Sequence, residues 1–294
     1  MYVIIGATGF LGTYLIHNIL QTTNEKILAV ARKEKEHLQT EFCPCDISDE
    51  REVIKLNNQY LSKSSGNKII YLAAYHHPDM VEKNPKLAWD INVTSLSRFL
   101  NIAENVECFF YSSTDSVYGE GNEEYRFKED DELHPVNKYG LHKCVAERLV
   151  TGYGYNVVRF PFLISSSLTP EKKHFYDEIA ETISQNKHIE MFCDSYRSAL
   201  DFNTASKMLI RLIEKYTPEM PQIINICGDE ALSKYDVGLR IADRLKVNSD
   251  LIRPVSIHDN KTADIFGTKR AASTLMDNTR LKEILGLQEV KIDL

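Results

Sequence analysis

Tyr139 and Lys143 stand four residues apart in a stretch, 139–151, whose apolar spacing predicts a helix. Residues four apart share one face of a helix, so the ammonium would lie beside the phenol. A nearby positive charge favours the tyrosinate and would lower the pKa of the phenol towards the range of an acid or base catalyst. Thr114, at the end of an apolar run, could hydrogen-bond the same substrate oxygen. These three side chains predict a site that transfers a proton to or from an oxygen atom.

Three glycines near the N-terminus predict a site for a dinucleotide. They follow an apolar run, 2–5, and precede a stretch of helical periodicity, 10–21. The first glycine permits a sharp turn, the second lets the backbone approach a pyrophosphate, and the third lets the helix pack closely on its strand. The N-terminus of that helix would direct amide donors and a positive dipole end at the phosphates. The residues predicted to contact the cofactor here are Gly6, Thr8, Gly9, Phe10, Leu11 and Gly12.

Two cations stand where such a site distinguishes NAD(H) from NADP(H). An acidic residue at the end of the second strand binds the ribose 2′-hydroxyl and repels a 2′-phosphate. This chain has Arg32 and Lys33 there and no acid. Because a guanidinium can bind phosphate through two hydrogen bonds, the pair favours NADP(H), with NAD(H) as the alternative. A solvated basic turn would explain the same two residues without a ligand.

The elements that must position these groups alternate between strand and helix. Uniformly apolar runs of this kind are typical of a parallel sheet covered on both faces. We therefore predict an α/β fold, a Rossmann doubly wound parallel sheet with a smaller α/β substrate-binding lobe. The apolar runs are 26–31, 68–73, 107–112 and 155–160, and the helical stretches between them are 49–61, 85–105 and 139–151. The dinucleotide-binding domain is predicted over 1–160 with returning segments at about 194–225, and the lobe over 161–193 and 226–294.

The composition of the chain argues against some classes of binding partner. The formal net charge of the 294 residues is -7 and no long basic run is present, so we expect no binding to nucleic acid or to an anionic membrane. No apolar run is long enough to span a bilayer, and Met1 leads directly into the first strand, which leaves no room for a signal peptide. The six cysteines are scattered and predict free thiols rather than a metal site. We expect a cytoplasmic protein.

Three stretches carry a resemblance to the extended short-chain dehydrogenase/reductase family, and within it to the dTDP-4-dehydrorhamnose reductase-like group. Residues 73–95 resemble the family's AAYTxVDxAExxP…NxxS segment, and 114–118 resemble its STDYVF motif. Residues 268–277 resemble its RPxxSxLD stretch, although Ala271 stands where the reductases usually have proline. That departure leaves the identity of the sugar open.

The resemblance implies further site residues. The additional cofactor contacts are Asp46, Ile47, Leu72, Ala73, Ala74, Asn92, Ser112 and Phe160, together with Tyr139 and Lys143. The implied substrate contacts are Tyr75, Thr114, Asp115, Ser116 and Arg270. Tyr139 would donate a proton to a carbonyl oxygen as hydride arrives from the nicotinamide, while Lys143 stabilises the charge left behind.

The activity that this resemblance implies is reduction of a keto group on a nucleotide-linked deoxysugar. A nucleotide-sugar dehydratase is disfavoured, because Ser116 stands where its motif has a glutamate base. A nucleotide-sugar 4-epimerase is the nearest enzymatic alternative. An alternative of another class is a non-catalytic NADP-binding regulatory subunit, as in methionine adenosyltransferase; retention of Thr114, Tyr139 and Lys143 favours the enzyme. Which nucleotide and sugar are bound stays open, as does the oligomeric state, for which a homodimer is one option.

Overall fold

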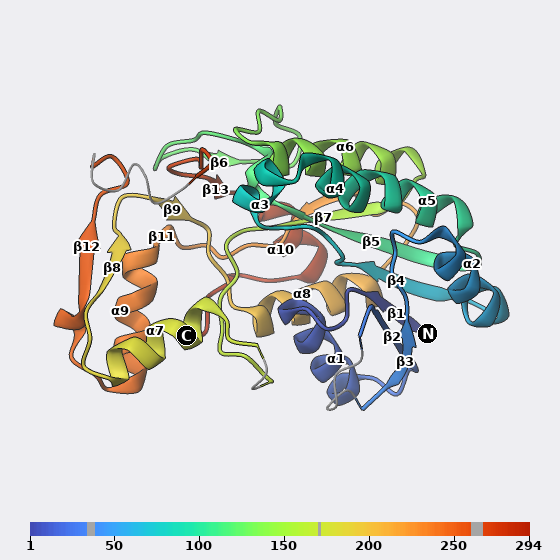
Figure 1. Cartoon of the computed structure of the whole chain (residues 1–294), viewed down its shortest axis with the longest axis horizontal. Coiled ribbons are helices and arrows are strands. Elements are labelled where there is room, and N and C mark those ends of the chain that lie inside the picture. The colour runs from blue at the N-terminus through green and yellow to red at the C-terminus, as the bar shows by residue number, and fades with distance from the viewer. Residues whose placement is uncertain (34–38, 170–171, 260–266) are drawn as a thin grey trace.

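A seven-stranded parallel sheet forms the centre of the computed structural model, which describes residues 1–33, 39–169, 172–259 and 267–294 (Figure 1). The strand order is β10-β7-β5-β4-β1-β2-β3, and every neighbouring pair is parallel. The chain runs outward in both directions from β1 and β4, which makes the gap between them a topological switch point. The predicted doubly wound sheet is confirmed. Its strands are β1 (Tyr2–Ile5), β2 (Ile27–Ala31), β3 (Glu41–Pro44), β4 (Asn67–Tyr71), β5 (Val106–Thr114), β7 (Asn156–Phe160) and β10 (Ile223–Asn225).

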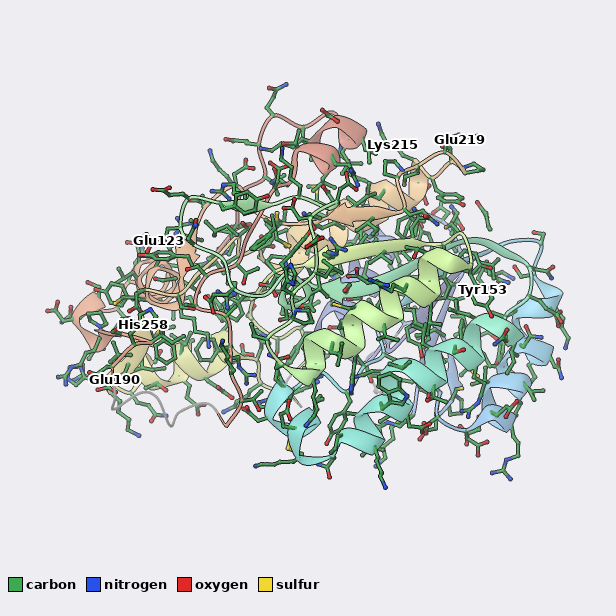
Figure 2. All side chains as sticks on the ribbon, turned by 90° about the horizontal axis from the view of Figure 1, so that it is seen from above. Glu123, Tyr153, Glu190, Lys215, Glu219 and His258 are labelled. Carbon is green, nitrogen blue, oxygen red and sulfur yellow. The ribbon has the colours of Figure 1, made fainter. Side chains whose placement is uncertain are left out.

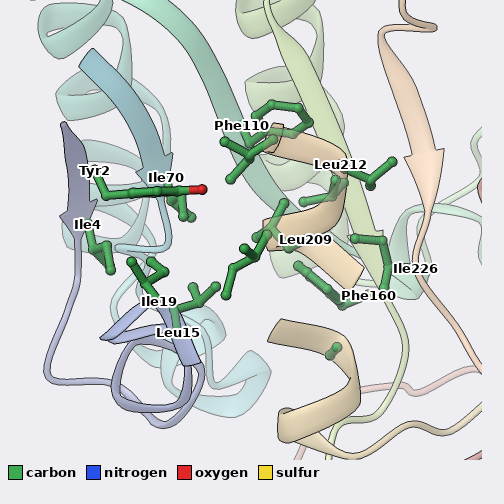
Figure 3. Close-up of a cluster of buried hydrophobic side chains, with 14 of the residues drawn as sticks. Tyr2, Ile4, Leu15, Ile19, Ile70, Phe110, Phe160, Leu209, Leu212 and Ile226 are labelled. Atoms are coloured by element: carbon green, nitrogen blue, oxygen red, sulfur yellow. The ribbon is translucent and has the colours of Figure 1, made fainter. Parts of the chain in front are cut away.

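One face of the sheet is covered by α1 (Phe10–Thr22), α8 (Phe202–Glu214) and α10 (Thr279–Leu285). Side chains from β1, β4, β5 and β7 meet those of α1 and α8 in a continuous apolar core (Figure 3). Tyr2, Ile4, Ile70 and Phe110 in this core are fully buried. Burial of this kind stabilises by roughly 25 cal/mol for each Å² of apolar surface removed from water.

The other face is covered by α2 (Glu50–Gln59), α5 (Ser95–Ile102) and α6 (Lys138–Gly152), with the short helix η1 (Leu61–Lys63) beside α2. Val3, Ile5, Ile69 and Phe109 point to this side and are fully buried. Since both faces are covered, β1 and β2 are apolar along their whole length rather than at alternate positions, and β4 and β5 each contain an unbroken apolar run.

The single helix that the sequence predicted over 85–105 is divided into α4 (Pro85–Trp89), a π-helical turn, η2 (Asp90–Thr94), and α5. A further short helix, α3 (Pro78–Lys83), precedes it. Pro85 starts α4, and its missing N–H cannot continue the ladder from α3. The π-helical turn adds a residue to the repeat, and such turns are frequent at functional sites.

A second group of elements lies beyond the carboxyl ends of the sheet strands and has its own apolar core. It consists of α7 (Phe175–Ser184), β8 (Ile189–Phe192), β9 (Tyr196–Arg197), β11 (Leu232–Ser233), α9 (Lys234–Leu245), η4 (Ser249–Leu251) and β12 (Ile252–Val255). Figure 2 labels Glu190 and His258 at this end of the molecule and Tyr153 and Glu219 at the other. Helix α10 falls within the range predicted for the lobe, yet Leu281 and Leu285 pack into the core of the sheet. The division into domains stays a prediction.

Two short strands, β6 (Arg126–Phe127) and β13 (Leu275–Met276), pair in parallel outside the central sheet. The six cysteines are free thiols. Within the described ranges, no His, Cys, Asp and Glu side chains gather in a group that could hold a metal ion. The helices seen in those ranges are all too short or too polar to cross a membrane.

Candidate active site

The glycine-rich turn joins β1 to α1 at the switch point of the sheet. Gly6 has a φ of +91°, and a Cβ added there would lie 2.9 Å from the backbone nitrogen of Ala73, which follows β4. A Cβ on Gly12 would lie 2.5 Å from the carbonyl oxygen of Ala7. Side chains are therefore excluded by contact at both positions. These contacts let the turn pack against the residues after β4 and let α1 pack against the turn; approach of a pyrophosphate to the backbone at Gly9 stays a prediction.

Phe10, the first residue of α1, contacts two aromatic side chains, His174 at the start of α7 and Phe202 of α8. Its ring centroid lies 4.6 Å from that of His174 and 5.9 Å from that of Phe202. Leu11 is partly buried against the apolar core under α1. Both residues were predicted to contact the cofactor; the group each of them can offer there is its backbone amide. That contact remains a prediction.

The second predicted anchor lies at the ends of β2 and β3. Arg32 and Lys33 follow β2 and are exposed. Asp46 follows β3 and accepts hydrogen bonds from the backbone nitrogen and the hydroxyl of Ser48, at 2.9 and 2.7 Å. These hydrogen bonds, with help from the Arg32 charge, hold the pKa of Asp46 below its usual value. Ile47 is buried beneath the turn. This part of the predicted cofactor site thus combines a hydrogen-bond acceptor, Asp46, with two exposed cations, Arg32 and Lys33.

Tyr139 and Lys143 are placed by α6, whose first turn is capped by Asn137 through a 2.9 Å hydrogen bond from the Gly140 amide. The Lys143 ammonium donates to the carbonyl oxygen of Ser112 at 2.7 Å. It lies 5.9 Å from the Tyr139 ring centroid. Because Ser112 belongs to the same strand as Thr114, the structure brings all three predicted catalytic residues to the carboxyl end of β5. Their catalytic roles remain predictions.

The pKa of Tyr139 differs from the expectation drawn from the sequence. Burial and the neighbouring Asp115 raise the pKa of Tyr139 above its usual value. The expectation that Lys143 lowers the pKa of the phenol is therefore wrong for this structure. Burial also lowers the pKa of Lys143 to about 7, against a weaker opposing effect of Glu147. Burial is the largest cause of both shifts, because it penalises the charged form of each group.

Asp115 is a buried carboxyl at the end of β5, in the short helix η3 (Asp115–Val117). Thr114 donates to its Oδ1 at 3.0 Å, and the Ser116 amide donates to the Thr114 hydroxyl at 3.2 Å. Arg197 Nε lies 3.3 Å from its Oδ2. Burial raises the pKa of Asp115, and Arg197 opposes that rise. The predicted substrate residues Thr114, Asp115 and Ser116 thus form one hydrogen-bonded group.

Arg197 is the residue that the sequence analysis missed. It belongs to β9 and pairs in register with Leu232 of β11. Its guanidinium also donates to the carbonyl oxygens of Ala271 and Ala272, at 2.6 and 2.8 Å. The one local signal, an arginine between short polar and apolar residues, is too common to single it out. Its partner Asp115 is far away in the sequence.

Asn92 is placed by the π-helical turn and holds the loop after β4. Its side-chain oxygen accepts from the Tyr75 amide at 2.7 Å, and its nitrogen donates to the Tyr75 carbonyl at 3.1 Å. Leu72, Ala73 and Ala74 lead into this loop. The structure therefore gives Asn92 a part in shaping the loop. Its predicted contact with the cofactor, like those of Leu72, Ala73, Ala74, Ser112 and Phe160, remains a prediction.

Two residues predicted to contact ligands, Phe160 and Arg270, direct their side chains to other residues in this structure. Phe160 ends β7 and packs its side chain into the core under α1. Arg270 forms an ion pair with Asp79 of α3, with Nη2 3.0 Å from Oδ2. That ion pair joins the stretch after residue 267 to the nucleotide-binding part of the chain. Binding of substrate by Arg270 remains a prediction.

The switch-point glycines, together with the Tyr139–Lys143 pair at the end of β5, define a protein of the short-chain dehydrogenase/reductase class. The chain belongs to the RmlD substrate binding domain family, which matches residues 1–292. This result confirms the resemblance stated from the motifs.

The relatives include proteins of two kinds. The chain is 27% identical over 224 residues to methionine adenosyltransferase 2 subunit beta of Bos taurus, covering 74% of this chain but only 65% of that protein. It is 24% identical over 295 residues to dTDP-4-dehydrorhamnose reductase of Aggregatibacter actinomycetemcomitans, covering 97% and 93% of the two chains. A solved dTDP-4-dehydrorhamnose reductase from Bacillus anthracis, in complex with NADP, superposes with a TM-score of 0.78 at 20% identity, covering 98% and 94%.

Proposed function

We propose that this protein is an NADP(H)-dependent oxidoreductase that reduces a keto group on a nucleotide-linked deoxysugar. The observation that carries the proposal is the meeting of Thr114, Tyr139 and Lys143 at the carboxyl end of β5, two strands from the glycine-rich turn. Ligands bind at this edge of open α/β sheets, outside a switch point. Likeness to a named dTDP-4-dehydrorhamnose reductase over almost the whole chain supports the same conclusion.

The residues present fit the cofactor. Gly6 and Gly12 leave no room for a Cβ, and the backbone between them would hold the pyrophosphate at the start of α1. The exposed Arg32 and Lys33 would bind a 2′-phosphate, for which a guanidinium is well shaped. Bound there, NADPH supplies a hydride for the carbonyl carbon. NAD(H) remains the alternative cofactor.

The chain's own residues provide the proton. The raised pKa of Tyr139 keeps its phenol protonated near neutral pH, which is the form that a proton donor requires. Tyr139 would give this proton to the substrate's carbonyl oxygen. The Lys143 ammonium would stabilise the phenolate left behind, and the Thr114 hydroxyl would turn from Asp115 to the same oxygen. Ser116 cannot serve as a base, so the site favours reduction over dehydration.

A second candidate is a cofactor-binding subunit without catalysis. The observation that favours it is the likeness to methionine adenosyltransferase 2 subunit beta, although the aligned region spans 65% of the bovine protein. The chain retains Thr114, Tyr139 and Lys143, and the Lys143 ammonium lies 5.9 Å from the Tyr139 ring centroid, which favours the enzyme. A 4-epimerase is not favoured. Six free thiols support a reducing, cytoplasmic setting, where such an enzyme would supply nucleotide sugars for polysaccharide biosynthesis.

The test is a panel of 4-keto-6-deoxy nucleotide sugars, with dTDP, GDP, CDP and UDP as carriers, each incubated with the purified protein and NADPH. Loss of the reduced nicotinamide's absorbance with at least one sugar, and formation of the alcohol, supports the proposal. Binding of NADPH with no oxidation by any sugar would favour the non-catalytic subunit instead.

A further inference from the structure

A buried ion pair lies one helical turn below the predicted catalytic lysine. Glu147 of α6 and Arg159 of β7 make two hydrogen bonds, Nε–Oε1 at 3.0 Å and Nη2–Oε2 at 2.7 Å. Their side chains are 3% and 2% exposed, so both charges are removed from water. Removal of two ions from water costs several kcal/mol each, and the attraction between them only offsets that cost when the geometry is good. Here the geometry is bidentate, which is the favourable arrangement.

The two members of this ion pair make further hydrogen bonds, one of them with β5, the strand that carries Thr114. Ser113, the preceding residue of β5, donates its hydroxyl to the Glu147 carboxylate. Arg159 Nη1 donates to the Tyr118 hydroxyl at 2.8 Å and to the Glu129 carbonyl at 3.0 Å. Tyr118 directly follows η3, the turn that contains Asp115 and Ser116. The Tyr118 hydroxyl in turn donates to Asn225 of β10 at 2.8 Å.

Helix α6, which carries Tyr139 and Lys143, therefore holds the Glu147 carboxylate that strand β5, which carries Thr114, contacts through Ser113. Glu147 lies four residues after Lys143, on the same face of α6. Ser113 is the neighbour of Thr114 on β5. A helix packed on a sheet by apolar side chains alone can slide or rotate slightly, whereas a bidentate ion pair fixes both its height and its rotation. A displacement of about 1 Å at a catalytic group can reduce a rate about 100-fold.

Stability alone is a weak reason for such a pair. Well-packed apolar residues of similar volume are often as stabilising as a buried ion pair, or more so. Loss of only one partner is different, because it leaves an uncompensated buried charge. An apolar replacement would keep the core filled, but would remove the directional hydrogen bonds to Ser113 and Tyr118.

We propose that Glu147 and Arg159 are positioning residues, whose ion pair fixes Tyr139 and Lys143 on α6 relative to Thr114 on β5. This inference deepens the reductase proposed above and partly rests on it. The Glu147 charge adds a second effect, because it opposes the burial that lowers the pKa of Lys143. Tyr139 of α6, Tyr111 of β5 and His76 of the loop after β4 also lie near the Lys143 ammonium.

The test uses the full chain, labelled with ¹⁵N at lysine Nζ, and follows the Lys143 signal by NMR as the pH is raised. The signal is assigned by its loss in Lys143→Met. In Glu147→Gln the midpoint for Lys143 should fall by at least half a pH unit, because a stabilising negative charge is gone. Glu230→Gln is the matched control: it breaks an ion pair with Arg240 in the second lobe and should leave the midpoint unchanged.

A second variant keeps the inference testable if Glu147→Gln fails to fold. In Glu147→Leu with Arg159→Met, neither charge of the ion pair remains and the volume is similar, so the chain should fold, as judged by circular dichroism and Trp89 fluorescence. Its Lys143 midpoint should also fall, and kcat should drop at least tenfold while the KM for NADPH changes less than threefold. A folded double variant with an unchanged midpoint and an unchanged kcat would overturn the inference.

The two proposals fail in different ways. If the wild-type protein reduces no sugar in the panel, the proposed activity fails, and the NMR midpoints still decide whether Glu147 controls Lys143. If the wild type is active and both variants keep its midpoint and its kcat, the reductase stands and the positioning role is wrong. A loss of melting temperature with no change in midpoint or kcat would show that the ion pair has only a structural role, and would also overturn the inference.

Discussion

The glycine-rich turn and the α6–β5 junction are two halves of one predicted site, and they are held in different ways. At the turn, position is set by backbone contact: a Cβ at Gly12 would lie 2.5 Å from the Ala7 oxygen. At the junction, position is set by buried polar side chains, above all Glu147 and Arg159. At the turn, a side chain is excluded by contact at Gly6 and Gly12; at the junction, loss of one partner would leave a buried charge unpaired.

This difference teaches where each half is vulnerable. A steric turn is insensitive to pH and salt, but a single methyl group can distort it. A buried ionic network resists small changes in shape, yet responds to any change in charge, because unpaired charge inside a protein is costly. The predictions below test the two halves separately.

The largest effect is expected from Tyr139→Phe, which removes the proton donor and leaves the glycine-rich turn intact. Loss of one general acid typically costs about 10²–10⁴ in rate. Turnover of the keto sugar should fall by that factor, while the dissociation constant for NADPH stays within about threefold, less than the tenfold that 1.4 kcal/mol represents. Steady-state kinetics and a fluorescence titration measure the two. A wild-type rate in this variant would show that Tyr139 is not the acid.

The next effect concerns pH. Burial lowers the pKa of Lys143 to about 7, so its ammonium loses its charge as the pH rises through that value. If the ammonium is required, kcat/KM should be high below about pH 7 and should fall about tenfold for each further unit, since this quantity follows the ionisation of the free enzyme. A profile of kcat/KM between pH 5.5 and 9, roughly the range that spans the Lys143 ionisation, checks this. A flat profile would separate Lys143 from catalysis.

The turn is tested by Gly12→Ala, which forces a methyl group against Ala7. Overpacking of this kind costs about 1–3 kcal/mol. We expect a lower melting temperature and weaker NADPH binding, with kcat at saturating substrate little changed. Gly152→Ala is the matched control, because no atom lies within 4 Å of a Cβ added there. A destabilised Gly152→Ala variant, or an unaffected Gly12→Ala variant, would contradict the steric account.

The last prediction concerns the edge of the cofactor site and the variant Arg32→Ala. A hydrogen bond to a charged group contributes about 1.5–3 kcal/mol, so the affinity for NADPH should fall about tenfold or more while that for NADH stays unchanged. Arg51→Ala removes an exposed arginine paired with Asp49 and serves as control. An equal loss of affinity for NADPH and NADH in Arg32→Ala, or tighter binding of NADH than of NADPH by the wild type, would remove the argument for NADP(H).

The sequence was informative wherever local chemistry determines structure. Uniformly apolar strands predicted a sheet covered on both faces, and the glycines at 6 and 12 predicted the turn that the backbone contacts now explain. The spacing of Tyr139 and Lys143 placed them on one helix face. Each of these features depends on residues close together in the chain, or on a pattern repeated within one element.

What the sequence could not predict depends on partners far apart in the chain. Arg197 reaches Asp115 only because β9 folds over the end of β5. The π-helical turn at Asn92 replaced part of one predicted helix, because Asn92 binds both backbone groups of Tyr75. The raised pKa of Tyr139 follows from burial and from Asp115, whereas spacing alone suggested the opposite direction.

The most direct test of the central claim is oxidation of NADPH by the wild-type protein with a dTDP-linked 4-keto-6-deoxy sugar, followed by absorbance, with Tyr139→Phe measured beside it. We predict that the wild type oxidises NADPH in proportion to the alcohol formed, and that Tyr139→Phe binds NADPH but turns over at least 100-fold more slowly, the lower end of the range for a lost general acid. Equal rates in the two proteins would contradict the account, as would tight NADPH binding without oxidation by any carrier's sugar.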